Sequence, residues 1–239
     1  MTDSNKPLEG RLALVTGASR GIGAAIAEAF GRAGAHVILV ARTAAGLEEV
    51  EERIHQAGGS ATIAPLDLLD GDSIGKLAAA IEDRWGQLDL LVLNAAMLGS
   101  LTPVEHIEAK EFSRLLSLNV GSSQALIAAF DRLLRRSDRA EVIGVTSSVG
   151  RTPRAFWGAY GASKAALETL LGSYAEETSH AGRLRVHIVD PGATRTRMRA
   201  LAFPGEEPET LKGPEVVGSA VLDLVTGDGP TGQRVRVEG

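Results

Sequence analysis

The amino-acid sequence predicts one α/β domain built on a doubly wound sheet of seven parallel strands. Short, nearly continuous apolar runs alternate with longer stretches that have helical periodicity. This alternation is typical of strands whose two faces are both covered by helices. At 239 residues, of which 44% are hydrophobic, the chain is long enough to bury one large core of this kind.

The elements can be placed in order along the chain. The apolar runs are rich in leucine and β-branched residues, and the stretches between them carry apolar residues three or four positions apart. We predict strands at residues 12–16, 36–41, 61–65, 88–93, 141–146, 184–189 and 233–237, and helices at residues 22–33, 44–57, 71–86, 103–136, 157–181 and 213–226.

The longest irregular stretch runs from residue 195 to residue 213 and is interrupted by Pro204, Gly205 and Pro208. A loop of that length in a compact α/β domain is often functional. We predict a substrate lid at 195–213, within a single domain of residues 1–239. A loose surface loop is the alternative.

The composition argues against several classes of protein. A net charge of −5 disfavours a nucleic-acid binder, which usually carries a basic face. The chain has no cysteine, and its five histidines show no ligand spacing, so we expect no disulfide and no metal site. The first ten residues are polar, and no apolar run approaches the ~20 residues of a membrane span. We therefore expect a cytoplasmic protein that does not bind membranes.

A glycine-rich turn follows the first predicted strand and opens the first predicted helix, in the order Gly17-Ala-Ser-Arg-Gly21-Ile-Gly23. Glycine lets the backbone turn tightly and approach a pyrophosphate, and the helix N-terminus offers free N–H groups to that anion. We predict that the turn binds a dinucleotide through Gly17, Ser19, Arg20, Gly21, Ile22 and Gly23.

Arg42 stands at the end of the second predicted strand, where an NAD-binding protein usually carries an acidic residue for the ribose 2′-hydroxyl. An arginine instead suits a 2′-phosphate, which it can grasp with two hydrogen bonds. The sequence thus favours NADP(H) over NAD(H). The alternative is that Arg42 is only a solvated residue at the next helix start.

Tyr160 and Lys164 are four residues apart in a predicted helix, so their side chains share one face. A nearby ammonium favours the phenolate, and we predict that Lys164 lowers the pKa of Tyr160 from its ordinary value near ~10. A tyrosine tuned in this way can act as an acid–base catalyst. Alone, such a pair also occurs on ordinary surface helices.

The glycine turn and the Tyr160-Gly-Ala-Ser-Lys164 motif together resemble the short-chain dehydrogenase/reductase family. Weaker matches lie between and after them, in the same order as in the family. The resemblance implies a Rossmann-type fold with strand order 3-2-1-4-5-6-7 and helices on both faces. It also implies further cofactor-binding residues, namely Asp67, Leu68, Asn94, Ala95, Ala96, Tyr160, Lys164, Pro191, Gly192, Thr194 and Thr196.

The resemblance also assigns catalytic roles. Tyr160 would donate a proton to the developing alkoxide, Lys164 would lower its pKa and hold the nicotinamide ribose, and Ser147 would hydrogen-bond the carbonyl oxygen. Ser148 is the second choice for that serine. Asn119 would anchor a water that relays protons to Lys164. The family further implies homodimers or homotetramers that pair through the helices at 103–136 and 157–181.

The sequence therefore favours an NADP(H)-dependent oxidoreductase that transfers a hydride between the nicotinamide and a carbonyl or secondary alcohol. A regulatory protein that binds NADP(H) without catalysis is the alternative, and an epimerase or dehydratase on the same scaffold is a third. Arg195, Arg197 and Arg199 could steer an anionic substrate or could simply be solvated. The expected pocket lining is apolar in part, with Met97, Leu98, Leu101, Phe156, Trp157, Met198, Leu201 and Phe203 as its members.

Overall fold

A computed structural model describes residues 6–238 and confirms the predicted sheet. Within this range seven strands pair in parallel, in the order β3-β2-β1-β4-β5-β6-β7. The strands are β1 (Leu12–Thr16), β2 (His36–Ala41), β3 (Ser60–Pro65), β4 (Leu90–Leu93), β5 (Ala140–Val145), β6 (Leu184–Asp190) and β7 (Gln233–Arg236). The strand order reverses between β1 and β4. In such sheets ligands bind in the crevice beyond the carboxyl ends of the strands at this point.

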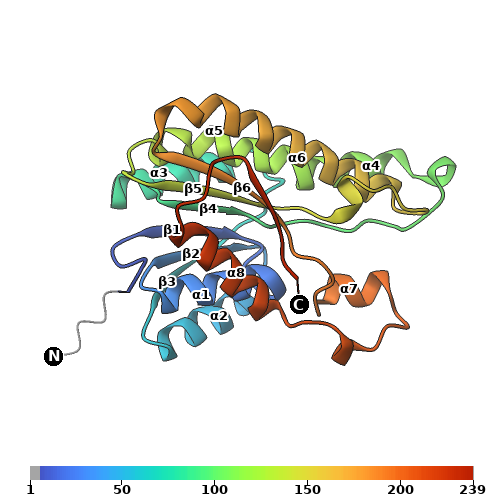
Figure 1. The fold of residues 1–239 in the computed structure, drawn as a ribbon, viewed down its shortest axis with the longest axis horizontal. Helices are drawn as coiled ribbons and strands as arrows, with labels where there is room; N and C mark the ends of the chain where they lie inside the picture. Colours follow the sequence, from blue (N-terminus) through green and yellow to red (C-terminus); the bar gives the residue numbers. More distant parts are fainter. Residues whose placement is uncertain (1–5, 239) are drawn as a thin grey trace.

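Helices cover both faces of the sheet (Figure 1). One layer holds α1 (Gly21–Arg32), α2 (Ala44–Gln56) and α8 (Pro214–Thr226), and the other holds α3 (Ser73–Trp85), α5 (Ser122–Leu134) and α6 (Gly158–Thr178). The short helix α7 (Arg197–Ala202) lies away from both layers, to the right in Figure 1. None of the helices described is long and apolar enough to span a membrane.

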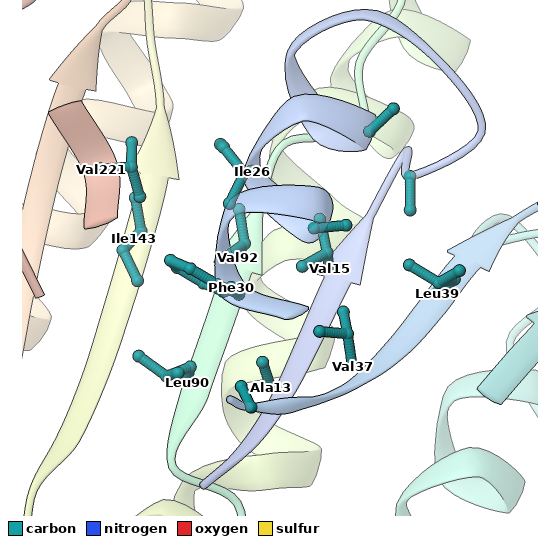
Figure 2. Close-up of a cluster of buried hydrophobic side chains, with 14 of the residues drawn as sticks. Ala13, Val15, Ile26, Phe30, Val37, Leu39, Leu90, Val92, Ile143 and Val221 are labelled. Carbon is teal, nitrogen blue, oxygen red and sulfur yellow. The ribbon is translucent and has the colours of Figure 1, made fainter. Parts of the chain in front are cut away.

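The core lies on both sides of the sheet, because alternate residues of a strand point to opposite faces. On β1, Ala13 and Val15 belong to the apolar cluster on the side of α1 and α8, and Leu12 and Leu14 belong to the cluster on the opposite side. Figure 2 shows the first cluster, in which Phe30 of α1 lies fully buried among strand residues. The two clusters make the sheet a rigid base for the loops at its carboxyl edge.

The helix expected at 103–136 is divided in the structure. A short 3-10 helix (Val104–His106) is followed by extended residues at 107–108, and only then does α4 (Ala109–Leu116) begin. A π-helical turn, Ser117–Gly121, joins α4 to α5. The apolar residues of this region keep their helical spacing across both interruptions, because each interruption involves only a few residues. The sequence pattern therefore does not reveal them. π-turns inside helices occur often at functional sites.

The stretch expected to be irregular, 195–213, contains the short helix α7. The hydroxyl of Thr196 caps this helix by accepting a hydrogen bond of 3.2 Å from the backbone N–H of Arg199. A helix of six residues is too short to give a readable period. The remaining element boundaries differ from the expected ones by only a few residues, the usual range for such boundaries.

Candidate active site

A cleft of about 820 Å³ opens beyond the carboxyl ends of the central strands. It is lined by the glycine turn after β1, by the ends of β2, β4, β5 and β6, and by the segment that contains α7. The sequence-predicted residues that line it are Gly17, Ser19, Arg20, Gly21, Ile22, Arg42, Asp67, Leu68, Asn94, Ala95, Ala96, Ser147, Tyr160, Lys164, Pro191, Gly192, Thr194 and Thr196. Gly23 and Asn119 do not line it. Gly23 instead shapes the glycine turn, and Asn119 holds neighbouring segments together through hydrogen bonds.

Gly23 shapes the glycine turn from beneath. A Cβ atom on Gly23 would lie 2.3 Å from the carbonyl oxygen of Gly17, closer than any real contact of that kind. Gly17 itself has a φ of +66°, in the left-handed region that favours glycine. The turn can therefore fold back tightly onto the start of α1, which leaves the N-terminal N–H groups of that helix facing the cleft.

Asn94 and Thr16 hold the turn against the end of β4. The side-chain amide of Asn94 donates to the carbonyl oxygen of Thr16 at 2.9 Å. The Thr16 hydroxyl donates to Val92 O at 2.9 Å and accepts from the Asn94 backbone N–H at 3.0 Å. These bonds fix the glycine turn relative to the neighbouring strand.

Two cationic side chains line the cleft, one from the glycine turn and one from the end of β2. Arg20 and Arg42 are exposed and line the cleft, Arg42 at the tip of β2. Asp67, beyond β3, accepts a hydrogen bond of 3.0 Å from the backbone N–H of Leu69. This part of the cleft offers arginine, rather than carboxylate, to a ligand at the end of β2.

Tyr160 and Lys164 lie on the face of α6 that is turned toward the sheet, and both are almost fully buried. The Lys164 ammonium donates to Val145 O at 2.9 Å and lies 5.6 Å from the centre of the Tyr160 ring. The Tyr160 hydroxyl contacts the sulfur of Met198, 3.8 Å away. The helix thus presents the phenol and the ammonium together, as the four-residue spacing predicts.

Burial dominates the protonation of this pair. It lowers the pKa of Lys164 to about 8, with a partial opposing effect from Glu168. It also raises the pKa of Tyr160, and the nearby Asp190 carboxylate adds to that rise. The expected lowering of the Tyr160 pKa is not found in this structure, because burial and Asp190 both disfavour the phenolate and together raise the pKa. Tyr160 is therefore held as a proton donor.

Ser147 follows β5 directly, is half-buried, and lines the cleft. Ser148 also lines the cleft, but its side chain is exposed and it begins a short 3-10 helix. The half-buried position of Ser147 suits a hydrogen bond to a bound ligand better than the exposed position of Ser148.

Asn119 is buried in the π-helical turn, and its side chain is fully engaged. Its amide oxygen accepts from the Met97 backbone N–H at 2.9 Å, and its amide nitrogen donates to Met97 O at 2.9 Å and to Ser163 Oγ at 3.0 Å. Asn119 therefore ties the loop after β4 to α6 next to Lys164. The side chain acts here as a positioning group.

Glu168, which is not among the residues predicted from the sequence, lies one helical turn after Lys164 and is buried. It accepts a hydrogen bond of 2.6 Å from Thr146 and one of 2.8 Å from Arg151, and it pairs with Arg234 of β7. Its spacing continues the series Tyr160, Lys164, Glu168 on one helix face, a signal that could have been read from the sequence.

Side chains of the segment 195–213 lie close to Tyr160. Phe203, just after α7, lies 5.6 Å from Trp157 between ring centres, and Trp157 meets Tyr160 edge-on at 5.9 Å. Of the predicted arginine group, Arg199 is paired with Glu206 through two hydrogen bonds of 2.5 Å. Arg195 and Arg197 are exposed and line the cleft.

Over the part of the chain that the structure describes, no group of three or more histidine or carboxylate side chains could hold a metal ion. Fold and site together define a nucleotide-binding α/β protein of the Rossmann type.

The chain belongs to the short chain dehydrogenase family, whose model matches residues 11–207. It is 38% identical over 224 residues to the uncharacterized oxidoreductase YciK of Escherichia coli K12, in an alignment that covers 92% of this chain and 88% of YciK. These findings confirm the family that the motifs indicated.

Solved structures agree with this assignment. A short chain dehydrogenase from Pseudomonas syringae superposes with a TM-score of 0.94 at 40% identity, covering 98% of this chain and 97% of that one. A protein so described from Escherichia coli CFT073, complexed with NADPH, superposes with a TM-score of 0.91 at 36% identity, covering 99% and 100%. A similar protein from Shigella flexneri 2a, complexed with NADP, gives the same TM-score, identity and coverage.

Proposed function

We propose that this chain is an NADP(H)-dependent oxidoreductase that interconverts a carbonyl compound and an alcohol. The observation that carries the proposal is the position of Tyr160, whose hydroxyl faces the cleft while Lys164 and Ser147 line the same space. The NADPH and NADP complexes of two similar structures support the choice of cofactor.

The residues present fit such a cofactor. A glycine turn that admits no Cβ at Gly23, together with the N-terminus of α1, suits a pyrophosphate. Arg42 at the tip of β2 suits the 2′-phosphate that distinguishes NADP(H) from NAD(H). Asp67, Leu68, Ala95 and Ala96 would border the adenosine half. Pro191, Gly192, Thr194 and Thr196 would border the nicotinamide.

When bound, the nicotinamide supplies or accepts the hydride. The protein supplies the proton and the positioning. Tyr160, a phenol that is protonated at neutral pH and whose pKa burial raises further, donates to the carbonyl oxygen as negative charge develops there. Ser147 donates a second hydrogen bond to the same oxygen. Lys164 places a positive charge beside the phenol, which stabilises the phenolate that proton transfer leaves behind.

We also propose that residues 195–213 form the substrate lid, since α7 places Met198 against the Tyr160 hydroxyl. By resemblance to the family, we propose a cytoplasmic homodimer or homotetramer whose subunits pair through α4, α5 and α6. Light scattering of the purified protein would measure its oligomeric state.

The decisive experiment measures oxidation of NADPH and of NADH over a panel of aldehydes and ketones. We expect turnover with NADPH, and a loss of about 10²–10⁴-fold in kcat for Tyr160→Phe, which removes only the proton donor. Tight binding of NADPH with no Tyr160-dependent turnover of any substrate would instead favour the regulatory alternative.

A further inference from the structure

The cleft is far more positive than the protein as a whole. Its lining includes the arginines Arg20, Arg42, Arg154, Arg195, Arg197, Arg199 and Arg236, as well as Lys164. Its acidic members are Asp67 and Asp190. The chain itself carries a net charge of −5, so this excess of cations is a local feature. Clefts with one sign of charge concentrate ligands of the opposite sign.

Most of these arginines already have a partner or a place at the phosphate end. Arg199 is paired with Glu206 at 2.5 Å, and Arg236 with Glu238 at 3.1 Å. Arg195 and Arg197 flank Thr196, whose methyl group would lie 3.5 Å from a Cβ on Gly21. Thr196 therefore lies over the glycine turn, and Arg195 and Arg197, its neighbours in the chain, are exposed side chains that line the cleft.

Arg154 and Arg199 both lie on the aromatic wall next to Tyr160, but Arg199 is paired with Glu206. The guanidinium carbon of Arg154 is 4.8 Å from the centre of the Phe203 ring and 5.8 Å from that of Trp157. Trp157 in turn meets the Tyr160 ring at 5.9 Å. The cation is thus one aromatic side chain away from the proton donor.

Within residues 6–238, Arg154 makes no ion pair of its own, and the Glu206 carboxylate, which pairs with Arg199, attracts it from a greater distance. Among the residues that the structure describes, no carboxylate oxygen lies within 4.0 Å of the Arg154 guanidinium. Contact with ring faces fixes the direction of a guanidinium and leaves its N–H groups available for hydrogen bonds. Between Arg154 and Tyr160 the surface is apolar, formed by Trp157, Phe203 and Met198.

From this arrangement we infer that the substrate is a carbonyl compound with an apolar body and an anionic group, and that Arg154 binds the anion. The body lies over Trp157, and the carbonyl takes the place of the Met198 sulfur at the Tyr160 hydroxyl. Met198 can yield this place, because an unbranched thioether side chain changes rotamer readily. The inference rests on the proposed function and adds a substrate class to it.

A binding experiment tests the inference without turnover. The protein saturated with NADP⁺ is titrated with 4-acetylbenzoate and, separately, with its methyl ester, which has the same body and no charge. The fluorescence of Trp157 reports binding, and Trp85 on α3 gives a constant background. We expect the acid to bind about tenfold more tightly than the ester, the usual effect of one hydrogen-bonded charge pair. The flexible pair 6-oxoheptanoate and its methyl ester is titrated in the same way.

Variants of Arg154 distinguish a site that binds the anion from a residue that only packs against Phe203. Arg154→Gln should abolish the preference for the acids and leave the affinity for the esters within about twofold, whereas Arg154→Lys should retain part of the preference. Arg183→Gln, which removes an exposed arginine that pairs with Asp138, is the matched control and should change neither the preference for the acids nor the affinity for the esters. Equal binding of acid and ester by the wild-type protein, or an equal loss for both in Arg154→Gln, would overturn the inference.

Activity distinguishes this failure from failure of the proposed function. If neutral ketones are reduced in a Tyr160-dependent way while acids and esters bind equally, the substrate class is wrong and the oxidoreductase stands. If no compound is reduced in a Tyr160-dependent way, both fail.

Discussion

The hydroxyl of Thr146 donates a hydrogen bond of 2.6 Å to the carboxylate of Glu168, which ties the end of β5 to α6 beside the active site. Glu168 is buried, and Arg151 and Arg234 bind its other carboxylate oxygen. Burial alone would raise the pKa of Glu168, but its hydrogen bonds with Arg151, Thr146 and Arg234 lower it. Since Ser147 follows Thr146 directly, Glu168 positions that serine.

Replacing Glu168 with Gln should therefore weaken catalysis. The amide can still accept from Thr146 but cannot balance two arginines, so the end of β5 should lose its fixed position. We expect kcat to fall about tenfold, the scale of a misplaced hydrogen-bond donor. Because the Glu168 carboxylate also raises the pKa of Lys164, the alkaline limb of the pH–rate profile should move to lower pH. Steady-state kinetics across pH measure both effects.

Glu176→Gln supplies the control for this variant. Glu176 lies on the same helix and is exposed, so its replacement should change neither kcat nor the profile. A reduced kcat for Glu168→Gln with an unmoved alkaline limb would mean that Glu168 only stabilises the fold.

Lys164 gives the reaction its own pH dependence. Burial lowers the pKa of this lysine to about 8, so the ammonium is present below that pH and is lost as the pH rises through it. The carbonyl-reducing kcat/KM should fall above about pH 8, because a neutral amine no longer stabilises the phenolate. Lys164→Arg keeps its charge throughout this range and, in whatever activity remains, should not show the fall. A wild-type profile that stays flat to pH 10 would contradict this assignment.

The same burial makes Lys164 costly for stability. Its pKa in the folded protein is about 8, below its ordinary value. At neutral pH the lysine is charged in both states, and burying this charge lowers the free energy of unfolding. Lys164→Met should stabilise the protein at pH 7 by about 2 kcal/mol. Each unit by which burial lowers the pKa costs the folded protein ~1.4 kcal/mol, and the variant removes this cost but also loses the hydrogen bond to Val145 O. The gain should shrink as the pH rises from 8 toward 10.5, where the wild-type lysine is already neutral. Urea unfolding without cofactor at several pH values measures it, and a destabilised variant would contradict the argument.

Much of this architecture was readable from the sequence because it depends on local patterns. Buried strands with continuous apolar runs, such as β1 and β2, match their predicted ranges, and glycine spacing located the turn between β1 and α1. The interruptions of the helix expected at 103–136 were not readable. Asn119 forms hydrogen bonds with the backbone of Met97, which lies 22 residues earlier in the chain. A contact of this kind cannot be recognised from the spacing of apolar residues.

In the site, too, local motifs could be read from the sequence, whereas properties that depend on tertiary contacts could not. The motifs identified Tyr160 and Lys164 correctly as neighbours, but the direction of the Tyr160 pKa depends on burial, which spacing alone cannot give. Arg199 looked available in the sequence, yet the chain folds Glu206 back onto it. Arg154 carries no signal in the sequence, because its neighbourhood is formed by two aromatic rings, Trp157 and Phe203, and Phe203 lies far along the chain.

Arg42 should decide between the two nicotinamide cofactors. It is exposed and lines the cleft at the tip of β2, where it can bind a 2′-phosphate without hindrance. Arg42→Ala should weaken NADP⁺ binding by about tenfold, the scale of a lost charge-assisted hydrogen bond, and leave NAD⁺ binding within about twofold. Calorimetric titration with each cofactor measures this, with Arg53→Ala on α2 as the control arginine. If affinity for both cofactors fell equally, Arg42 would have no role in selecting between them.

Gly23 offers the sharpest test of the cofactor site, because it shapes the turn without lining the cleft. In Gly23→Ala the new methyl group would lie 2.3 Å from Gly17 O and 2.5 Å from the Asn94 amide, so the turn must open. The backbone cannot yield cheaply, and we expect a loss of about 1–3 kcal/mol in stability from overpacking. The opened turn should also bind NADP⁺ at least about tenfold more weakly.

Gly75→Ala is the matched control for Gly23→Ala. Gly75 also lies near the start of a helix, α3, but a Cβ there meets nothing within 4 Å. That variant should gain roughly 0.5–1 kcal/mol from helix propensity and keep its cofactor affinity. Thermal unfolding with and without NADP⁺ measures both quantities for each variant. A Gly23→Ala protein that binds NADP⁺ as tightly as the wild type would show that the cofactor's phosphates do not rest on this turn.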